Sequence, residues 1–316
     1  MLHGVMPARP GARMSLDELV GGMDSFFSVR DLAKDPSFGH VLPRTYEAAG
    51  VDWRTLFEPD FATRFNGLMV RGAPGVSAIF CAAFPSEDVL TDFCRQGREG
   101  DLLFLHHPLD MLCGDPRGEW GRGFVPIHAG LLDAVKGRGL SLYVCHAPLD
   151  THPRISTSRA MADALGGSVA ATFFPYGLGD AGLVCDVAPL GTKALVERAR
   201  DIFEVPYADV AGATHASLAR LAVVGGCGDD FEAIERAASL GARAYVTGEF
   251  RARVDTEFGR KRFAEMEAYA AKSSMSLVGV SHAASEFLVL RTQVAPWIRE
   301  EFGLEAHLLP PTRWWR

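Results

Sequence analysis

The sequence lacks several features that would assign it to a specialised class of protein. No apolar run approaches the roughly 18 residues of a membrane span, and the start, MLHGVMPARPGARM, has no apolar core of a secretory signal. The net charge of −7 provides no basic surface for nucleic acid. The six cysteines form no Cys-x-x-Cys pair, so we expect reduced, mostly buried thiols. These absences predict a cytoplasmic protein that binds neither membranes nor nucleic acid.

Apolar runs that alternate with amphipathic stretches predict an α/β fold. With 316 residues, 48% of them hydrophobic, the chain is long enough for two domains. We expect buried strands at 76–84, 101–105, 140–145, 218–224, 242–246 and 276–280. We expect helices at 85–95, 127–136, 156–165, 192–203, 231–240, 263–272 and 284–302. Such alternation is typical of βαβ units. It predicts two interleaved α/β domains with mainly parallel or mixed sheets covered by helices.

The expected organisation starts with a probable tail at 1–14. Ser15 and Glu18 match a capping box, which predicts a helix start there. Residues 28–60 are rich in Pro, Asp and Arg and give no clear assignment. We expect a first α/β domain at 15–165 and a second α/β half at 166–316.

Three short motifs bring histidines and carboxylates to the predicted strand ends. They read HHPLD at 106–110, HAPLD at 146–150 and SHAASE at 281–286. The carboxyl ends of strands are the usual ligand site in open α/β sheets. Imidazole with carboxylate suits zinc, iron, manganese or nickel and does not suit the all-oxygen sites of calcium. We therefore predict the following metal ligands: His106, His107, Asp150, His282 and Glu286.

The number and spacing of these ligands favour two divalent ions. Five ligands are too many for one open catalytic site, but they suit two metals that share a bridging carboxylate. His282 and Glu286 are four positions apart at a helix start, so they share one face. His106 and His107 are adjacent at a strand end, where successive side chains point to opposite sides and would reach two different metals. One such histidine alone would more often be a hydrogen-bonded core or surface residue, so the prediction depends on the three motifs together.

Five motifs lie in order between about residue 66 and about residue 286: FLHHPLDM, YVCHAPLDTHP, VVGGCGDD, AYVTGEF and GVSHAASE. In these motifs the chain resembles the dinuclear metal-centre hexameric proteins, the GTP cyclohydrolase 1 type 2 homologues. It implies a homohexamer of two-domain subunits. It also implies that Glu286 bridges two metals, with His107 and Asp150 on one and His106 and His282 on the other. Only 132 positions separate Asp150 from His282, so we expect no inserted mid-chain domain.

The glycine-rich segment 225–228 allows two interpretations. It could bind a phosphate at a helix N-terminus. However, Asp229 and Asp230 follow directly and would repel an anion. A strand-to-helix turn with an Asp N-cap is the favoured interpretation.

Other polar residues are candidates for catalysis or substrate binding. His146 and His152 flank Asp150, and either could orient the carboxylate, transfer a proton or serve a structural role. Glu249 ends a predicted strand and is a candidate general base, so Glu249 and His146 are the candidate catalytic residues. Arg251 and Arg253 could bind a phosphorylated substrate, although a solvated charged loop is the favoured interpretation.

The leading functional hypothesis is a metal-dependent hydrolase of unknown substrate. A dimetal site activates water and stabilises an oxyanion, which suits hydrolysis of phosphoesters, amidines or nucleotide rings. The substrate would be a small, phosphorylated or nucleotide-like molecule. The alternative is a non-catalytic metal-binding scaffold or metal-handling protein. An open coordination position would favour the enzyme, and a saturated site the scaffold.

Overall fold

The computed structural model describes residues 13–316 and divides the chain into two compact units. Unit 1 contains the chain up to Asp110 with Phe124–Leu149 and Leu290–Thr312, and unit 2 contains Met111–Gly123, Asp150–Val289 and Arg313–Arg316. Most of the predicted tail, residues 1–12, lies outside the described residues, and Met14 belongs to strand β1 (Met14–Ser15). The predicted domain boundary after residue 165 stays a prediction.

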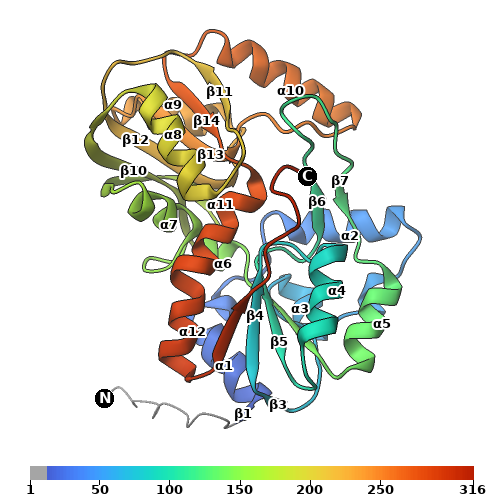
Figure 1. Cartoon of the computed structure of the whole chain (residues 1–316). Helices are drawn as coiled ribbons and strands as arrows, with labels where there is room; N and C mark the ends of the chain where they lie inside the picture. Colours follow the sequence, from blue (N-terminus) through green and yellow to red (C-terminus); the bar gives the residue numbers. More distant parts are fainter. Residues whose placement is uncertain (1–12) are drawn as a thin grey trace. The chain divides into compact units, whose positions relative to one another are not determined.

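A five-stranded sheet forms the centre of unit 1 (Figure 1). Its strands, in spatial order, are β15 (Glu305–Leu308), β4 (Ala78–Ala82), β5 (Leu102–Leu105), β8 (Ser141–Val144) and β2 (Gly67–Val70). The first four are parallel, and β2 is antiparallel to β8. Strands β5 and β8 are buried along their whole length. This burial explains their continuous apolar sequence, because helices cover both faces of the sheet.

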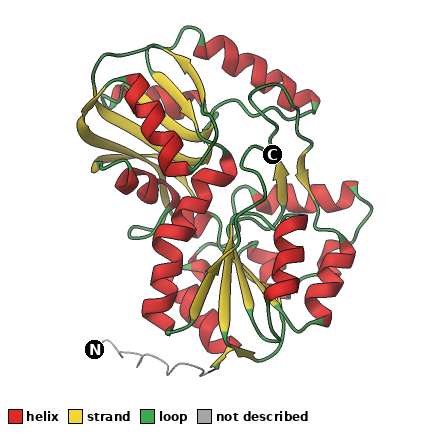
Figure 2. Cartoon of the chain, viewed as in Figure 1, coloured by secondary structure: helices red, strands yellow, loops and turns green. Residues whose placement is uncertain are grey.

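Helices lie on both sides of this sheet (Figure 2). They are α1 (Leu16–Phe26), α2 (Phe38–Ala48), α3 (Pro59–Arg64), α4 (Glu87–Gln96), α5 (Ala129–Gly137) and α12 (Ala295–Phe302). Leu103 belongs to the core formed with Phe93 of α4, whereas the Phe104 ring contacts the Phe27 ring. Helix α1 begins after Ser15 as predicted. The predicted capping box is wrong, because the Ser15 side chain makes no capping hydrogen bond.

Unit 2 contains a mixed six-stranded sheet. Its strands, in spatial order, are β11 (Asp209–Gly212), β14 (Ser276–Gly279), β13 (Ala244–Glu249), β12 (Leu218–Cys227), β10 (Gly179–Leu190) and β9 (Ser168–Tyr176). Strands β12, β13 and β14 are parallel, and the outer strands pair antiparallel. The predicted α/β fold with parallel or mixed sheets is confirmed in both units.

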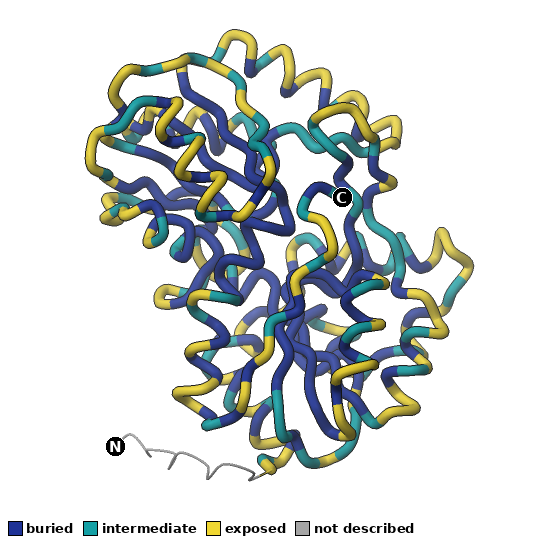
Figure 3. Tube along the Cα trace, in the orientation of Figure 1, coloured by how far each residue is buried: buried dark blue, intermediate teal, exposed yellow. Residues whose placement is uncertain are grey.

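Helices also cover the sheet of unit 2. They are α7 (Thr157–Ala164), α8 (Thr192–Phe203), α9 (Phe231–Ser239), α10 (Glu257–Ala270) and α11 (His282–Val289). Helices α7 and α11 contact β12, whereas Ile234 of α9 and Met266 of α10 belong to a core with Tyr245 of β13. Figure 3 shows buried strands and helices with exposed outer faces in each unit.

The structure also bears on two predictions from composition, which concern membrane-spanning helices and the cysteines. No helix among residues 13–316 is both long and apolar enough to span a membrane. None of the six cysteines, all of which lie within residues 13–316, forms a disulfide, and four of them are buried. The expectation of reduced, mostly buried thiols therefore agrees with the structure.

Candidate metal-binding sites

Three buried histidines meet at the carboxyl ends of β5 and β8 in unit 1. His106 and His107 follow β5, and His146 follows β8 two positions after its last residue. Each of the three rings has its centroid 4.9 Å from both others. One ring nitrogen from each lies within 4.8 Å of the others, so the group could hold a metal ion. The sequence indicated an orienting, proton-transfer or structural role for His146 and did not include it among the metal ligands.

The histidine pair directly follows strand β5, which ends at Leu105. That the two side chains reach two different metals stays a prediction. His106 Nδ1 donates a hydrogen bond to the Cys145 carbonyl over 2.9 Å. This hydrogen bond leaves the lone pair on Nε2, which is the form of imidazole that binds metal.

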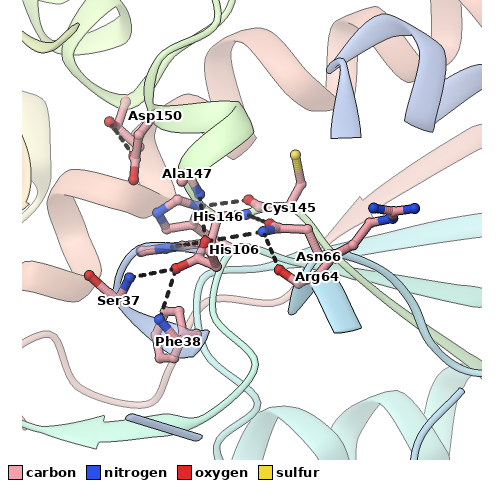
Figure 4. Close-up of polar contacts among 11 residues, drawn as sticks. Ser37, Phe38, Arg64, Asn66, His106, Cys145, His146, Ala147 and Asp150 are labelled. Atoms are coloured by element: carbon pink, nitrogen blue, oxygen red, sulfur yellow. Dashed lines mark hydrogen bonds and ion pairs between the residues drawn. The ribbon is translucent and has the colours of Figure 1, made fainter. Parts of the chain in front are cut away.

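The segment that the sequence left unassigned supplies the main partner of His146. Asp35 is 1% exposed, and its Oδ2 accepts hydrogen bonds from His146 Nδ1 at 3.0 Å and from Asn66 Nδ2 at 3.1 Å. Asn66 Oδ1 in turn accepts from the His146 backbone N–H at 2.7 Å (Figure 4). Burial opposes ionisation of Asp35, but the charge of His146 and these hydrogen bonds hold its pKa well below the ordinary value. The carboxylate therefore fixes the ring of His146, as partners of metal-binding histidines do.

His282 and Glu286 form a buried pair on one face of α11 in unit 2. His282 Nε2 lies 2.9 Å from Glu286 Oε1, as the spacing of four predicted. Ser281, directly before the helix, has a φ of 78°, a strained conformation for a residue with a side chain. Burial lowers the pKa of His282, but the Glu286 and Glu249 carboxylates outweigh this effect and raise it to about 10. A site this acidic favours a bound cation.

The glycine-rich segment makes room for this pair. A Cβ at Gly226 would lie 2.5 Å from Glu286 Oε1 and 3.0 Å from His282 Nε2, and the residue has a φ of 68°. Its N–H donates to Ser285 Oγ, and the N–H of Gly225 donates to Ser158 Oγ. Asp230 caps α9 through a hydrogen bond from the Ala233 N–H. The predicted Asp N-cap is confirmed, whereas residues 225–227 continue strand β12 and do not form the predicted turn.

The other ring nitrogen of His282, Nδ1, faces a second group of possible metal ligands, which includes a thiol. Cys113 Sγ lies 3.7 Å from His282 Nδ1, and Glu249 Oε2 lies 3.8 Å from the same nitrogen. The three ligand atoms lie within 4.8 Å of one another. Burial, together with Glu249 and other acidic neighbours, raises the pKa of the Cys113 thiol well above its ordinary value. Sequence reasoning missed Cys113, because a single cysteine outside any motif carries no signal.

The HAPLD motif ends at Asp150, the first residue of the second segment of unit 2. Thr157 Oγ1 donates a 2.8 Å hydrogen bond to Asp150 Oδ1, which orients the carboxylate. His152 Nδ1 accepts hydrogen bonds from the N–H groups of Arg154 and Ile155. These contacts favour the structural alternative for His152, because its ring stabilises a turn.

The two arginines after β13 are half-buried and pair with other side chains, which does not match the favoured solvated charged loop. The Arg251 side chain is 18% exposed and makes two hydrogen bonds to the Asp209 carboxylate. The Arg253 guanidinium lies over the Phe263 ring at 4.5 Å from its centroid. Both cations therefore have partners within unit 2.

Comparison with known proteins identifies the family. The sequence matches the family described as Duf34/NIF3 (NGG1p interacting factor 3) over residues 58–310. The chain belongs to the Duf34/NIF3 family. This family includes the GTP cyclohydrolase 1 type 2 homologues, so the predicted resemblance is confirmed. No curated protein matches the sequence.

Solved structures of low sequence identity share the fold. A protein named ybgI, described as of unknown function, is 20% identical with a TM-score of 0.63, over 95% of this chain and 100% of that one. TTHA1606 from Thermus thermophilus is 21% identical with a TM-score of 0.61, over 95% and 99%. Reduced HcgD from Methanocaldococcus jannaschii is 18% identical with a TM-score of 0.60, over 94% and 98%. This NIF3-family chain therefore has the fold of several structurally characterised proteins.

Proposed function

We propose that this NIF3-family protein binds two divalent metal ions and hydrolyses a small molecule. The proposed ligands are His106, His107, Asp150, His282 and Glu286, with Glu286 bridging the two ions. The metals would be zinc, iron, manganese or nickel. When bound, such ions would lower the pKa of a coordinated water and stabilise negative charge on the substrate.

The residues fit metal ions by the chemistry of their donors. The observation that carries the proposal is the His282–Glu286 pair, which is buried and 2.9 Å apart beside a glycine that leaves it room. In unit 1, the proposed ligand His106 directs Nδ1 to the Cys145 carbonyl. Such a partner fixes the ring orientation and raises the basicity of the nitrogen that binds metal.

The protein's own groups can bind and move protons in the proposed reaction. We propose that His146, oriented by Asp35, transfers a proton between solvent and the substrate. The predicted role of Glu249 as general base also stays a proposal, and its carboxylate faces His282 Nδ1 and Cys113. A phosphorylated or nucleotide-like substrate and a homohexameric assembly are further proposals, and the family supports them.

The alternative is a non-catalytic metal-handling protein. The buried group of Cys113, Glu249 and His282 supports it, because thiol, carboxylate and imidazole together are a donor set for transition metals. Screening the metal-loaded protein against phosphoesters, amidines and nucleotides separates the two functions. Hydrolysis that Glu286→Ala abolishes supports the enzyme, whereas two bound metals without turnover of any substrate class favour metal handling.

A further inference from the structure

Cys113, Glu249 and His282 come together from three distant parts of the chain in unit 2. Cys113 follows the short strand β6 (Asp110–Leu112), Glu249 is the last residue of β13, and His282 is the first residue of α11. Their exposed fractions are 4%, 6% and 6%. Thiol, carboxylate and imidazole therefore meet in an environment that largely excludes water.

One oxygen of the Glu249 carboxylate is buried without a hydrogen bond. Within the described range 13–316, its Oε2 makes no hydrogen bond to any residue. His282 Nδ1 forms an ion pair with it at 3.8 Å, a distance too long for a hydrogen bond. A buried carboxylate oxygen without a hydrogen bond is costly, and a metal cation would give it a close partner.

This group is distinct from the His282–Glu286 pair, because the two use opposite nitrogens of one ring. Nε2 faces Glu286, and Nδ1 faces Cys113 and Glu249. The pocket beside Cys113 and Glu249, of about 10 Å³, has space for one water molecule. Three protein ligands with space for a water are the donor set of an open tetrahedral site.

We propose that Cys113 Sγ, Glu249 and His282 Nδ1 bind one thiophilic transition metal ion, such as zinc, with water as the fourth ligand. Tetrahedral coordination by sulfur, nitrogen and oxygen requires ligand atoms roughly 3.3–3.6 Å apart. The observed 3.7 and 3.8 Å are close to that range. The thiolate selects against magnesium, calcium and manganese.

Binding at this site would release the thiol proton of Cys113 and the proton on His282 Nδ1, without any change of oxidation state. The inference rests on the proposed dinuclear centre, shares His282 with it and extends that function to a third ion, with Glu249 as a ligand of this ion instead of a general base. With both sites occupied, His282 would bind one ion through each nitrogen and would give up both ring protons.

Cobalt(II) tests the proposal, because it substitutes for zinc and a thiolate ligand gives a charge-transfer band in the near ultraviolet. We expect this band in the wild-type protein loaded with cobalt, and its loss in Cys113→Ser. Cys94→Ser, a half-buried thiol in unit 1, serves as the matched control and should retain the band. Glu249→Gln keeps the thiol and the shape of the side chain, and should weaken cobalt binding to this site at least about tenfold.

The outcomes separate this site from the dinuclear centre. The double variant His106→Ala/His107→Ala removes two proposed ligands of that centre and leaves Cys113 in place, so the band should persist. Cobalt bound without any thiolate band would overturn the proposed site while leaving the dinuclear centre intact. A band that disappears in Cys227→Ser and persists in Cys113→Ser would also overturn it. Circular dichroism of every variant excludes loss of the fold as the cause.

Discussion

His146 Nδ1 and Asp35 Oδ2 form a buried hydrogen bond of 3.0 Å between residues that are 111 positions apart in the sequence. The same carboxylate accepts hydrogen bonds from the N–H groups of Ser37 and Phe38 through its other oxygen. The pair therefore ties the segment before α2 to the end of β8. It gives His146 a fixed orientation before any metal or substrate arrives.

Asp35→Asn should destabilise the fold, because it removes the charge from a buried network of hydrogen bonds. Hydrogen bonds to charged groups contribute about 1.5–3 kcal/mol each, so we expect the free energy of unfolding to fall by roughly 2–4 kcal/mol. Urea denaturation measures it. The exposed Asp60→Asn is the matched control and should change the value by less than about 0.5 kcal/mol. An equal free energy of unfolding for Asp35→Asn and wild type would show that the hydrogen bonds of Asp35 do not stabilise unit 1.

The buried Asp24 carboxyl group should make the free energy of unfolding depend on pH. Burial raises its pKa despite a 2.9 Å hydrogen bond from the Tyr143 hydroxyl. A raised pKa means that the folded state prefers the protonated carboxyl group. Asp24 therefore lowers the free energy of unfolding as the pH rises through its pKa in the folded state. Asp24→Asn, which stays neutral, should therefore be more stable than wild type at pH 7. We expect denaturant unfolding between pH 5 and 8 to show that the stability difference between Asp24→Asn and wild type becomes smaller at lower pH. A difference that becomes larger at lower pH would contradict the raised pKa of Asp24.

Gly226→Ala should impair metal binding. The added methyl group would lie 2.5 Å from Glu286 Oε1, and a φ of 68° is unfavourable for alanine. We expect a loss of bound metal that exceeds any loss of helical signal in circular dichroism. Gly21→Ala in α1 is the control, because its Cβ would meet no atom within 4 Å. It should keep the metal and raise stability by about 0.5–1 kcal/mol. Full metal content in Gly226→Ala would exclude a ligand role for the pair beside it.

The proposed hexamer predicts a particle of six times the 34.2 kDa chain mass. Multi-angle light scattering at micromolar concentration measures the mass directly. A monomer under these conditions would contradict the assembly and would leave the metal-binding proposal untouched.

The sequence predicts the buried strands well, because continuous apolar runs are typical of sheets covered on both faces. The prediction for 192–203 coincides with α8, and the run at 102–105 is β5. The hairpin of β9 and β10 escapes prediction. Strand β9 lies at the sheet edge with most residues exposed or half-buried, so it shows no apolar run.

The partners of the candidate ligands could not be predicted in the same way. Asp35 reaches His146 and Cys113 reaches His282 only through tertiary folding, over 111 and 169 positions. No local pattern encodes contacts at such separation. The pair His282 and Glu286 was predictable, because a spacing of four on a helix fixes proximity.

Removal of the Asp150 carboxylate tests which of the two proposed metal ions this residue binds. Asp150→Ala should mainly weaken the ion that His107 also binds, because the other ion keeps His106, His282 and Glu286. Titration with manganese should then show one site near wild-type affinity and one site weakened about tenfold or more. Equal weakening of both sites would contradict the assignment of Asp150 to one ion.

The central claim is that five side chains bind two divalent ions, and the manganese content per chain tests it most directly. Manganese prefers nitrogen and oxygen ligands, so it should fill the dinuclear centre and not the thiolate site. After reconstitution and desalting, elemental analysis should give about two ions per chain in the wild type and in the exposed control His40→Ala. Glu286→Ala should lose most of both ions while keeping its circular dichroism spectrum. A wild type that binds no manganese, or a Glu286→Ala variant that retains both ions, would contradict the account.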